Sequence, residues 1–171
     1  PHVELFVAAE YTDRAVHSIL GGTLDVAICV QPPNVDGLHV EPLCRDELVV
    51  IVAPQHPWAR RRHVQWSDLA TQVLITYNHG SETFQMIQRE LHKRGVSIHD
   101  SMEVRHGTAV MEMVKVGLGV ALQPRWVVRD AIENGALKAL PLGRGGLKRQ
   151  WVLMYVKGAV LAEHDHAFIE L

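Results

Sequence analysis

Residues that could contact a small ligand follow the predicted apolar strands of this chain. They are Val30 at the end of "DVAICV" and Gln31 after it, His79, Ser81 and Thr83 after "VLITY", His106, Gly107 and Thr108 after "SMEVR", and Gln123 after "GVAL". Ligands of open α/β sheets bind beyond the carboxyl ends of the strands, and a helix that begins there offers unpaired amides to a carboxylate. We therefore predict these residues as a ligand-binding set. Simpler roles stay open for Ser81 and Thr108 as helix caps, for Val30 as a core residue and for His79 as a loop residue.

The histidines form neither a metal-binding nor a hydrolytic pattern. The chain has 11 histidines, but none forms an H-x-x-x-H pair that would place two ligands on one helix face. The chain also lacks a G-x-S-x-G nucleophile elbow, and no pattern places an acid to orient His79 beside Ser81. We predict no metal site, no catalytic residues and no cofactor, so the chain is not expected to be an enzyme.

The stretch "VKVGLGVALQPRW" at 114–126 looks like half of a phosphate-binding fingerprint, but its glycines are placed differently. A dinucleotide-binding loop needs glycines after a strand and before a helix, whereas Gly117 and Gly119 follow a predicted helix, and Leu122 takes the third position. Gly117 suits the positive φ of a helix C-terminus, and Gly119 begins a strand of four residues, "GVAL". We therefore predict an architectural role for the stretch, with Gln123 exposed at the end of its strand.

Charge and composition limit the possible partners. The net charge of -2 provides no basic field for nucleic acid, and we interpret the three arginines at 60–62 as a solvated surface. Cys29 and Cys44 lack metal-ligand spacing and fit a reducing compartment. No apolar run approaches the roughly 18 residues of a membrane span. We expect a cytoplasmic domain without membrane association and without DNA affinity of its own.

Hydrophobic periodicity and turn residues predict alternating strands and helices along the chain. The expected strands are 3–10, 25–30, 47–54, 73–77, 101–105, 119–122, 137–142 and 150–157, and the expected helices begin at 12, 81, 108, 125 and 165. Residues 3–30 are predicted to form a parallel βαβ unit, because the strand at 25–30 is apolar on both faces. The irregular basic stretch 57–65 predicts a boundary between two lobes.

Several motifs, in order along the chain, resemble the effector-binding region of LysR-type transcriptional regulators. They are "ILGGTLDVAI", "EPLCRDELVVIVAPQHPWA", "SDLA" and "VGLGVALQPRWV". The resemblance covers essentially the whole chain. It implies an α/β fold of two Rossmann-like lobes, periplasmic-binding-protein-like of type 2, with an effector between the lobes. Lobe one would hold 1–55 with 160–171, and lobe two 56–159.

Within that family, "QPRWVV", "ENGAL" and "HAFIEL" are most similar to the methionine-biosynthesis regulators that respond to homocysteine. The resemblance implies a sensor domain that binds a small amino-acid-like metabolite, forms a homodimer and makes a tetramer in the full regulator. Such a regulator reaches DNA only through an N-terminal helix-turn-helix. Neither that domain nor the first strand of the family's sensor domain is found before Pro1, so part of the effector site is expected to be missing.

The dimer contact is expected from apolar residues of the helix at 15–20 and the strand at 47–52. An alternative function is a solute-binding protein or a small enzyme on the same fold, because a fold does not determine a function. A signal peptide upstream would favour the solute-binding protein, whereas a helix-turn-helix upstream would favour the regulator.

Overall fold

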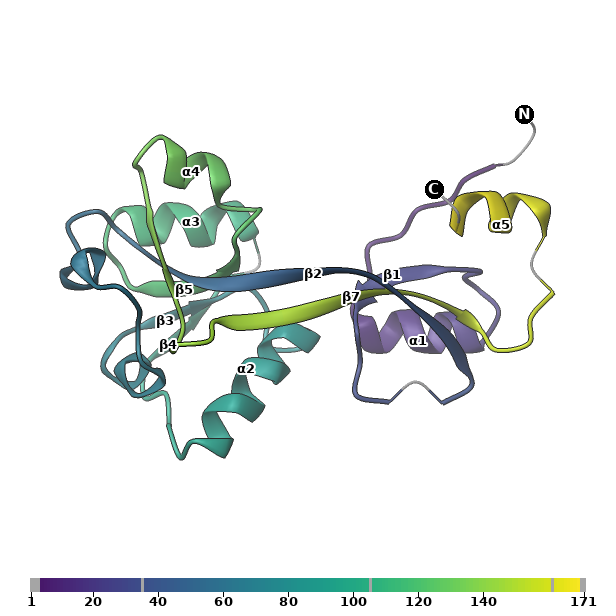
Figure 1. Ribbon diagram of the computed structural model, residues 1–171, viewed down its shortest axis with the longest axis horizontal. Helices are drawn as coiled ribbons and strands as arrows, with labels where there is room; N and C mark the ends of the chain where they lie inside the picture. The colour runs from purple at the N-terminus through teal and green to yellow at the C-terminus, as the bar shows by residue number, and fades with distance from the viewer. Residues whose placement is uncertain (1–3, 35, 105, 161, 170–171) are drawn as a thin grey trace. The chain divides into compact units, whose positions relative to one another are not determined.

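The computed structural model describes residues 4–34, 36–104, 106–160 and 162–169, which form two compact units (Figure 1). Unit 1 is Pro1–Arg45 with Gln150–Leu171, and unit 2 is Asp46–Arg149. Strands β2 (Leu38–Val52) and β7 (Leu147–Val156) belong to both units, so the change of unit comes inside two strands. The sequence predicts one lobe of 1–55 with 160–171 and another of 56–159. The boundaries between these lobes lie beyond the ends of both strands, and the predicted lobes stay a prediction.

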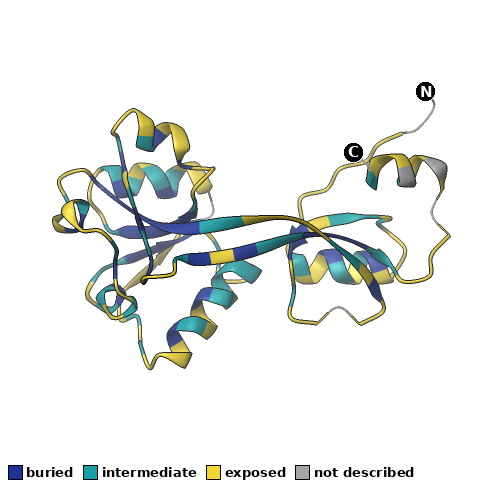
Figure 2. Cartoon of the chain, in the orientation of Figure 1, coloured by how far each residue is buried: buried dark blue, intermediate teal, exposed yellow. Residues whose placement is uncertain are grey.

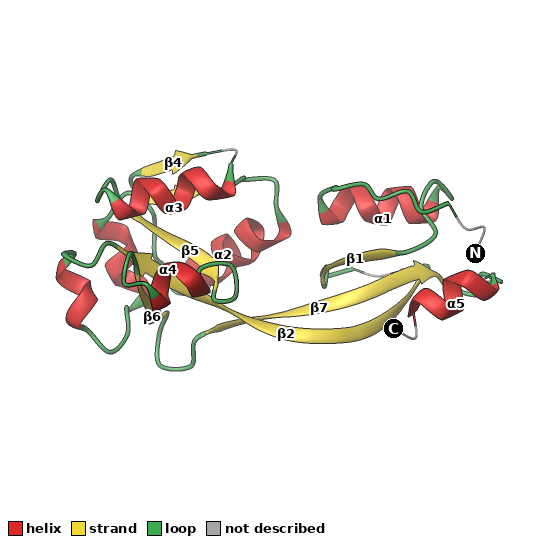
Figure 3. Cartoon of the chain, turned by 90° about the horizontal axis from the view of Figure 1, so that it is seen from above, coloured by secondary structure: helices red, strands yellow, loops and turns green. Residues whose placement is uncertain are grey.

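The other elements alternate along the chain as strands and helices (Figure 3). The strands are β1 (Ala27–Val30), β3 (Leu74–Thr76), β4 (Ser101–Glu103), β5 (Val120–Pro124) and β6 (Lys138–Pro141). The helices are α1 (Thr12–Leu20), α2 (Glu82–Lys93), α3 (Gly107–Lys115), α4 (Arg129–Glu133) and α5 (Glu163–Ile169), with 3-10 helices η1 (Pro57–Arg60) and η2 (Trp66–Thr71). The strand order is β1-β7-β2-β5-β3-β4, and β6 also pairs with β2.

Helices cover both faces of the sheet in unit 2, and β2 shows why. Side chains of a strand point alternately to opposite faces. Leu48, Val50 and Val52 pack in one apolar cluster with α2, η1 and η2, whereas Val49 and Ile51 pack in another with α3 and α4. All five side chains are fully buried, and the C-terminal part of β2, in unit 2, is dark blue in Figure 2. The expectation that the strand at 47–52 forms a dimer contact is therefore wrong, because the core of unit 2 already covers it.

The described residues of unit 1 do not form the parallel βαβ unit predicted for 3–30. Its β1 pairs antiparallel with β7, with Val30 opposite Trp151, and α1 packs its buried Ile19 into the cluster that also holds Cys29. Residues 4–10 form no strand, and Phe6 is 78% exposed. The pattern at 4–10 is typical of a strand, but a strand also needs a neighbour for its backbone hydrogen bonds, and the described residues supply none here.

The two glycines of 114–126 are architectural, as predicted. Gly117 has a φ of 81° just after α3, and its amide donates to the carbonyl of Val114 at 3.0 Å. Gly119 lies against the residue that precedes β3, and a Cβ added to it would stand 2.5 Å from the carbonyl oxygen of Val73. Only glycine fits such a contact without displacement of the backbone.

Several element boundaries differ from those predicted. Strand β2 begins at Leu38, because β-pairing continues through the polar stretch that precedes 47–54. Strand β5 is Val120–Pro124 rather than the predicted 119–122, and α4 is only Arg129–Glu133, since residues 125–128 form turns. The last helix begins at Glu163 rather than at 165, and residues 170 and 171 lie outside the described part of the chain.

Candidate functional site

Three parallel strands of unit 2 end at one edge of the sheet. Strand β3 pairs in parallel with β4, with Thr76 opposite Glu103, and with β5, with Ile75 opposite Ala121. This register brings the end of β5 at Gln123 to the same edge. Helices α2 and α3 begin just beyond the ends of β3 and β4. We call this region the strand-end edge; its residues are Thr76, His79, Ser81, Thr83, Glu103, His106, Gly107, Thr108 and Gln123.

His79 is held on three sides at the strand-end edge. Its Nε2 lies 3.1 Å from Thr76 Oγ1, its Nδ1 lies 3.3 Å from a carboxylate oxygen of Glu103, and its ring stacks on Phe84 at 4.3 Å between centroids. The Thr76 hydroxyl donates to the carbonyl oxygen of Met102 at 3.4 Å, so its oxygen accepts from Nε2–H. These contacts fix the orientation of the His79 ring beside the ends of β3 and β4.

The first turn of α2 is closed by hydrogen bonds within the chain. Ser81 is the N-cap, because its Oγ accepts from the amide of Phe84 at 3.2 Å and donates to the carbonyl oxygen of Asn78 at 2.9 Å. The amide of Gly80 donates to Asn78 Oδ1 at 2.6 Å. The capping role of Ser81 is therefore confirmed, whereas its contact with a ligand stays a prediction.

Thr83, in the same turn, is bonded to a buried ion pair. Its Oγ1 accepts from Nη1 of Arg149 at 2.6 Å. The guanidinium of Arg149 also donates through Nε to Asp46 Oδ1 at 2.9 Å and through Nη2 to Asp46 Oδ2. This two-point pairing is the strong geometry for arginine and a carboxylate.

The start of α3 is arranged differently from that of α2. The helix begins at Gly107, so His106 is the N-cap and Thr108 is the second helical residue. The prediction that Thr108 caps the helix is wrong, because the chain enters the helical conformation one residue earlier. His106 makes no side-chain cap bond, all three residues are exposed, and nothing stands within 4 Å of a Cβ added at Gly107.

The remaining predicted residues divide between the edge and unit 1. Gln123 is 8% exposed, which contradicts the expected exposure, because β5 lies between β2 and β3 in the sheet. Val30 is buried in β1 of unit 1. Gln31 is exposed there, and its amide donates to the carbonyl oxygen of Gln150 at 2.9 Å. The strand-end edge therefore includes every predicted residue except Val30 and Gln31.

Sequence reasoning missed four residues in or next to the strand-end edge: Thr76, Glu103, Asp46 and Arg149. Thr76 carried a signal, since it is a polar residue that ends the apolar stretch "LIT". Asp46 and Arg149 are opposite charges that stand beside apolar strand stretches, but their pairing spans 103 positions and no local pattern reports it.

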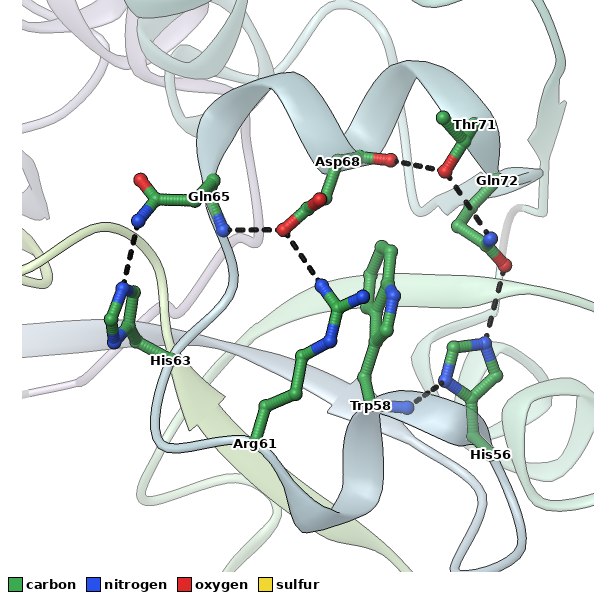
Figure 4. Close-up of polar contacts among 8 residues, drawn as sticks. All are labelled: His56, Trp58, Arg61, His63, Gln65, Asp68, Thr71 and Gln72. Carbon is green, nitrogen blue, oxygen red and sulfur yellow. Dashed lines mark hydrogen bonds and ion pairs between the residues drawn. The ribbon is translucent and has the colours of Figure 1, made fainter.

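A second polar network in unit 2 connects η1 to η2 (Figure 4). Arg61 donates to Asp68 at 3.0 Å, and the same Asp68 oxygen accepts from the amide of Gln65 at 2.8 Å. His56 lies 3.2 Å from Gln72 Oε1 and accepts from the amide of Trp58 at 3.1 Å. The network holds the two 3-10 helices together, and one of the three arginines at 60–62 is engaged by the chain's own carboxylate. The described residues include no group of three or more ligands suited to a metal ion.

Comparison with known proteins decides the family. Residues 1–171 match the family described as the LysR substrate binding domain. The chain belongs to this family. A curated relative of this LysR substrate-binding domain is the RuBisCO operon transcriptional regulator of Allochromatium vinosum, 28% identical over 171 residues, or 99% of this chain and 57% of the relative. The chain spans about half the length of the curated relatives that it matches.

Two solved structures establish the fold. The regulatory domain of MetR, a LysR family regulator from N. meningitidis, has a TM-score of 0.85 at 22% identity over 99% of this chain and 78% of that one. The regulatory domain of CcmR from Synechocystis, in complex with 2-PG, has a TM-score of 0.83 at 21% identity over 94% of this chain and 77% of that one. The predicted α/β, periplasmic-binding-protein-like type 2 fold is confirmed.

The curated relatives are transcriptional regulators rather than enzymes, as the sequence predicted. They include regulators of RuBisCO and of nitrogen assimilation, so the methionine subgroup is not established. None of the helices that the structure describes is long and apolar enough to cross a membrane.

Proposed function

We propose that this LysR substrate-binding domain is the sensory half of a bacterial transcription regulator, and that its strand-end edge binds a small amino-acid-like metabolite. The observation that carries the proposal is the open start of α3. His106, Gly107 and Thr108 are exposed, and no side chain caps the helix. An uncapped helix start presents amides and the positive end of the helix dipole to a carboxylate.

The edge also offers a place for the ammonium group of an amino acid. Glu103, beside His79, is the acidic side chain that the parallel register brings to this edge. An amino acid bound with its carboxylate at α3 would have its ammonium group attracted to the Glu103 carboxylate. The ligand contacts of Val30 and Gln31 stay a prediction.

We propose homocysteine as the effector, supported by the motifs "QPRWVV" and "ENGAL" and by the likeness of fold to MetR. The CcmR structure is in complex with 2-PG, and we take a phosphorylated acid without an ammonium group as the main competing class of effector. Glu103 would repel such an acid. The two effectors therefore make opposite demands on Glu103.

Thermal unfolding in the presence of each compound tests this proposal. At 100 times its dissociation constant, homocysteine should stabilise the folded chain by about 2.7 kcal/mol. The melting midpoint of a chain of this size should then rise by roughly 5–10 °C. Methionine, cysteine, O-acetylserine and 2-phosphoglycolate serve as controls, because a pocket matched to one thiol amino acid leaves polar groups unpaired around the wrong compound.

Two variants test whether the shift of the melting midpoint depends on the strand-end edge. Thr108→Val keeps the branched shape and removes the hydroxyl, and Ser81→Ala removes the cap of α2. If both residues contact the ligand, each variant should reduce the homocysteine shift beyond any change in the unliganded midpoint. If no thiol amino acid shifts the midpoint of the full-length regulator, homocysteine is wrong; if none of the compounds does, binding of an amino-acid-like metabolite at this edge is wrong.

We also propose that the domain forms homodimers, that the full regulator is a cytoplasmic tetramer, and that DNA is contacted through a helix-turn-helix domain. Leu20 on α1 is a half-exposed apolar residue that such a contact would cover. The negative net charge supports a lack of DNA affinity in this domain.

A further inference from the structure

A buried ion pair joins the two strands at the points where they enter unit 2. Asp46 is the first residue of unit 2 on β2, and Arg149 is its last residue on β7. Their side chains are only 8% and 4% exposed. Two buried charges in such a pair depend on each other, because neither can turn to water without breaking the pairing.

The ion pair also reaches two other segments of unit 2. Arg149 donates to Thr83 Oγ1 in the first turn of α2, and the indole Nε1 of Trp126 donates to Asp46 Oδ2 at 3.3 Å. Thr83 and Trp126 are therefore connected through two intervening side chains. Beside this connection, the backbone amide of Arg125 donates to the carbonyl oxygen of Glu47 at 2.9 Å, which fixes the loop that carries Trp126 against β2.

We propose that Arg149 is a positioning residue that couples the first turn of α2 to the two strands leaving unit 2. The guanidinium is planar, and its donors have fixed relative directions. A displacement of Thr83 therefore reorients the whole guanidinium of Arg149 and changes its hydrogen bonds to Asp46. The use of this coupling by an effector at the strand-end edge rests on the proposed function, but the coupling itself is measured without any effector.

Trp126 provides a direct reporter of the coupling. Its indole N–H donates to Asp46, so the indole signal in a ¹H–¹⁵N NMR spectrum responds to the position of that carboxylate. The signal is assigned with a Trp126→Phe variant. Thr83→Val removes the acceptor for Arg149 and keeps the branched side chain. This variant should move the Trp126 signal and speed amide exchange at 46–50 and 147–149 by about tenfold, the effect of losing one charge-assisted hydrogen bond.

The matched control is Thr71→Val in η2, whose hydroxyl donates to the carbonyl oxygen of Asp68 at 2.7 Å. It removes a threonine hydroxyl of unit 2 outside the Arg149 network, and it should leave the Trp126 signal and the exchange at both strands unchanged. A Trp126 signal that moves equally in both variants, or in neither, would overturn the proposal.

Arg149→Lys separates coupling from simple support. Lysine keeps the positive charge beside Asp46 but lacks the fork that bonds Asp46 and Thr83 together. In this background Thr83→Val should no longer move the Trp126 signal. If the Thr83→Val effect persists there, the coupling does not pass through Arg149.

Homocysteine added to the wild-type chain should move the Trp126 signal as well. If homocysteine leaves the Trp126 signal unchanged while the variants behave as expected, the proposed function is contradicted and the coupling through Arg149 still holds.

Discussion

The starts of α2 and α3 follow neighbouring parallel strands, yet one is closed and the other is open. At α2, Ser81 caps the backbone and Thr83 is bonded to a buried arginine. At α3, the N-cap His106 makes no side-chain bond and the first residues are exposed. The same βα topology therefore supplies one helix start that is anchored by the chain and one that is available to a ligand. The difference comes from the side chains at each start and from what β7 places beside them.

The largest expected loss of stability is at the Asp46–Arg149 ion pair, which anchors the start of α2. Asp46→Ala leaves the Arg149 guanidinium buried without its carboxylate, which should lower the free energy of unfolding by about 3–5 kcal/mol. Urea unfolding at neutral pH measures the loss. Glu112→Ala on α3, which breaks the exposed Lys115 pair, is the control, and its loss should stay below about 0.5 kcal/mol. Similar losses in the two variants would mean that α2 is not anchored more strongly than α3.

A smaller effect is expected at the caps themselves. Ser81→Ala removes the side-chain acceptor for the amide of Phe84 and should cost about 1 kcal/mol of stability. Thr108→Ala, at the second position of α3, removes no cap. Because alanine is the better helix former, this variant should be neutral or raise stability by a few tenths of a kcal/mol. In paired thermal melts without ligand, the midpoint should fall for Ser81→Ala and should not fall for Thr108→Ala; a loss for Thr108→Ala equal to that for Ser81→Ala would contradict the open start of α3.

The smallest effect is expected at the far end of α2. Hydrogen bonds from Lys93 and Arg94 lower the pKa of Glu90 below its usual value. A lowered pKa in the folded chain means that the stabilisation is present above the carboxyl's ordinary pKa and is lost as pH falls through the lowered value. Glu90→Gln should remove about 0.3–0.5 kcal/mol at pH 7, the typical worth of such exposed pairs. The difference from wild type should vanish in acid, as urea unfolding across the acidic range would show; a difference that grows in acid would be inconsistent with the lowered pKa.

Local patterns predicted those features of the site that depend on neighbours in the chain. Ser81 caps α2 because a serine just before an apolar helical stretch can accept a nearby amide, and the structure shows this bond. The ends of β3 and β4, with His79 and His106 beyond them, also follow from patterns of a few residues. The predicted exposure of Gln123 failed, because burial depends on which strands flank β5 and not on its own sequence.

The sequence by itself determined the succession of strands and helices in unit 2, the positive φ at Gly117 and the motifs that identify the LysR family. These depend on side-chain periodicity, backbone freedom and residue order, all of which act over a few positions. Only the tertiary structure decided that residues 4–10 form no strand, that 47–52 is core, and that Arg149 meets Thr83 and Asp46. Those partners lie 66 and 103 positions away in the chain. Contacts over such separations form only when the strands pair and bring the charges out of water together.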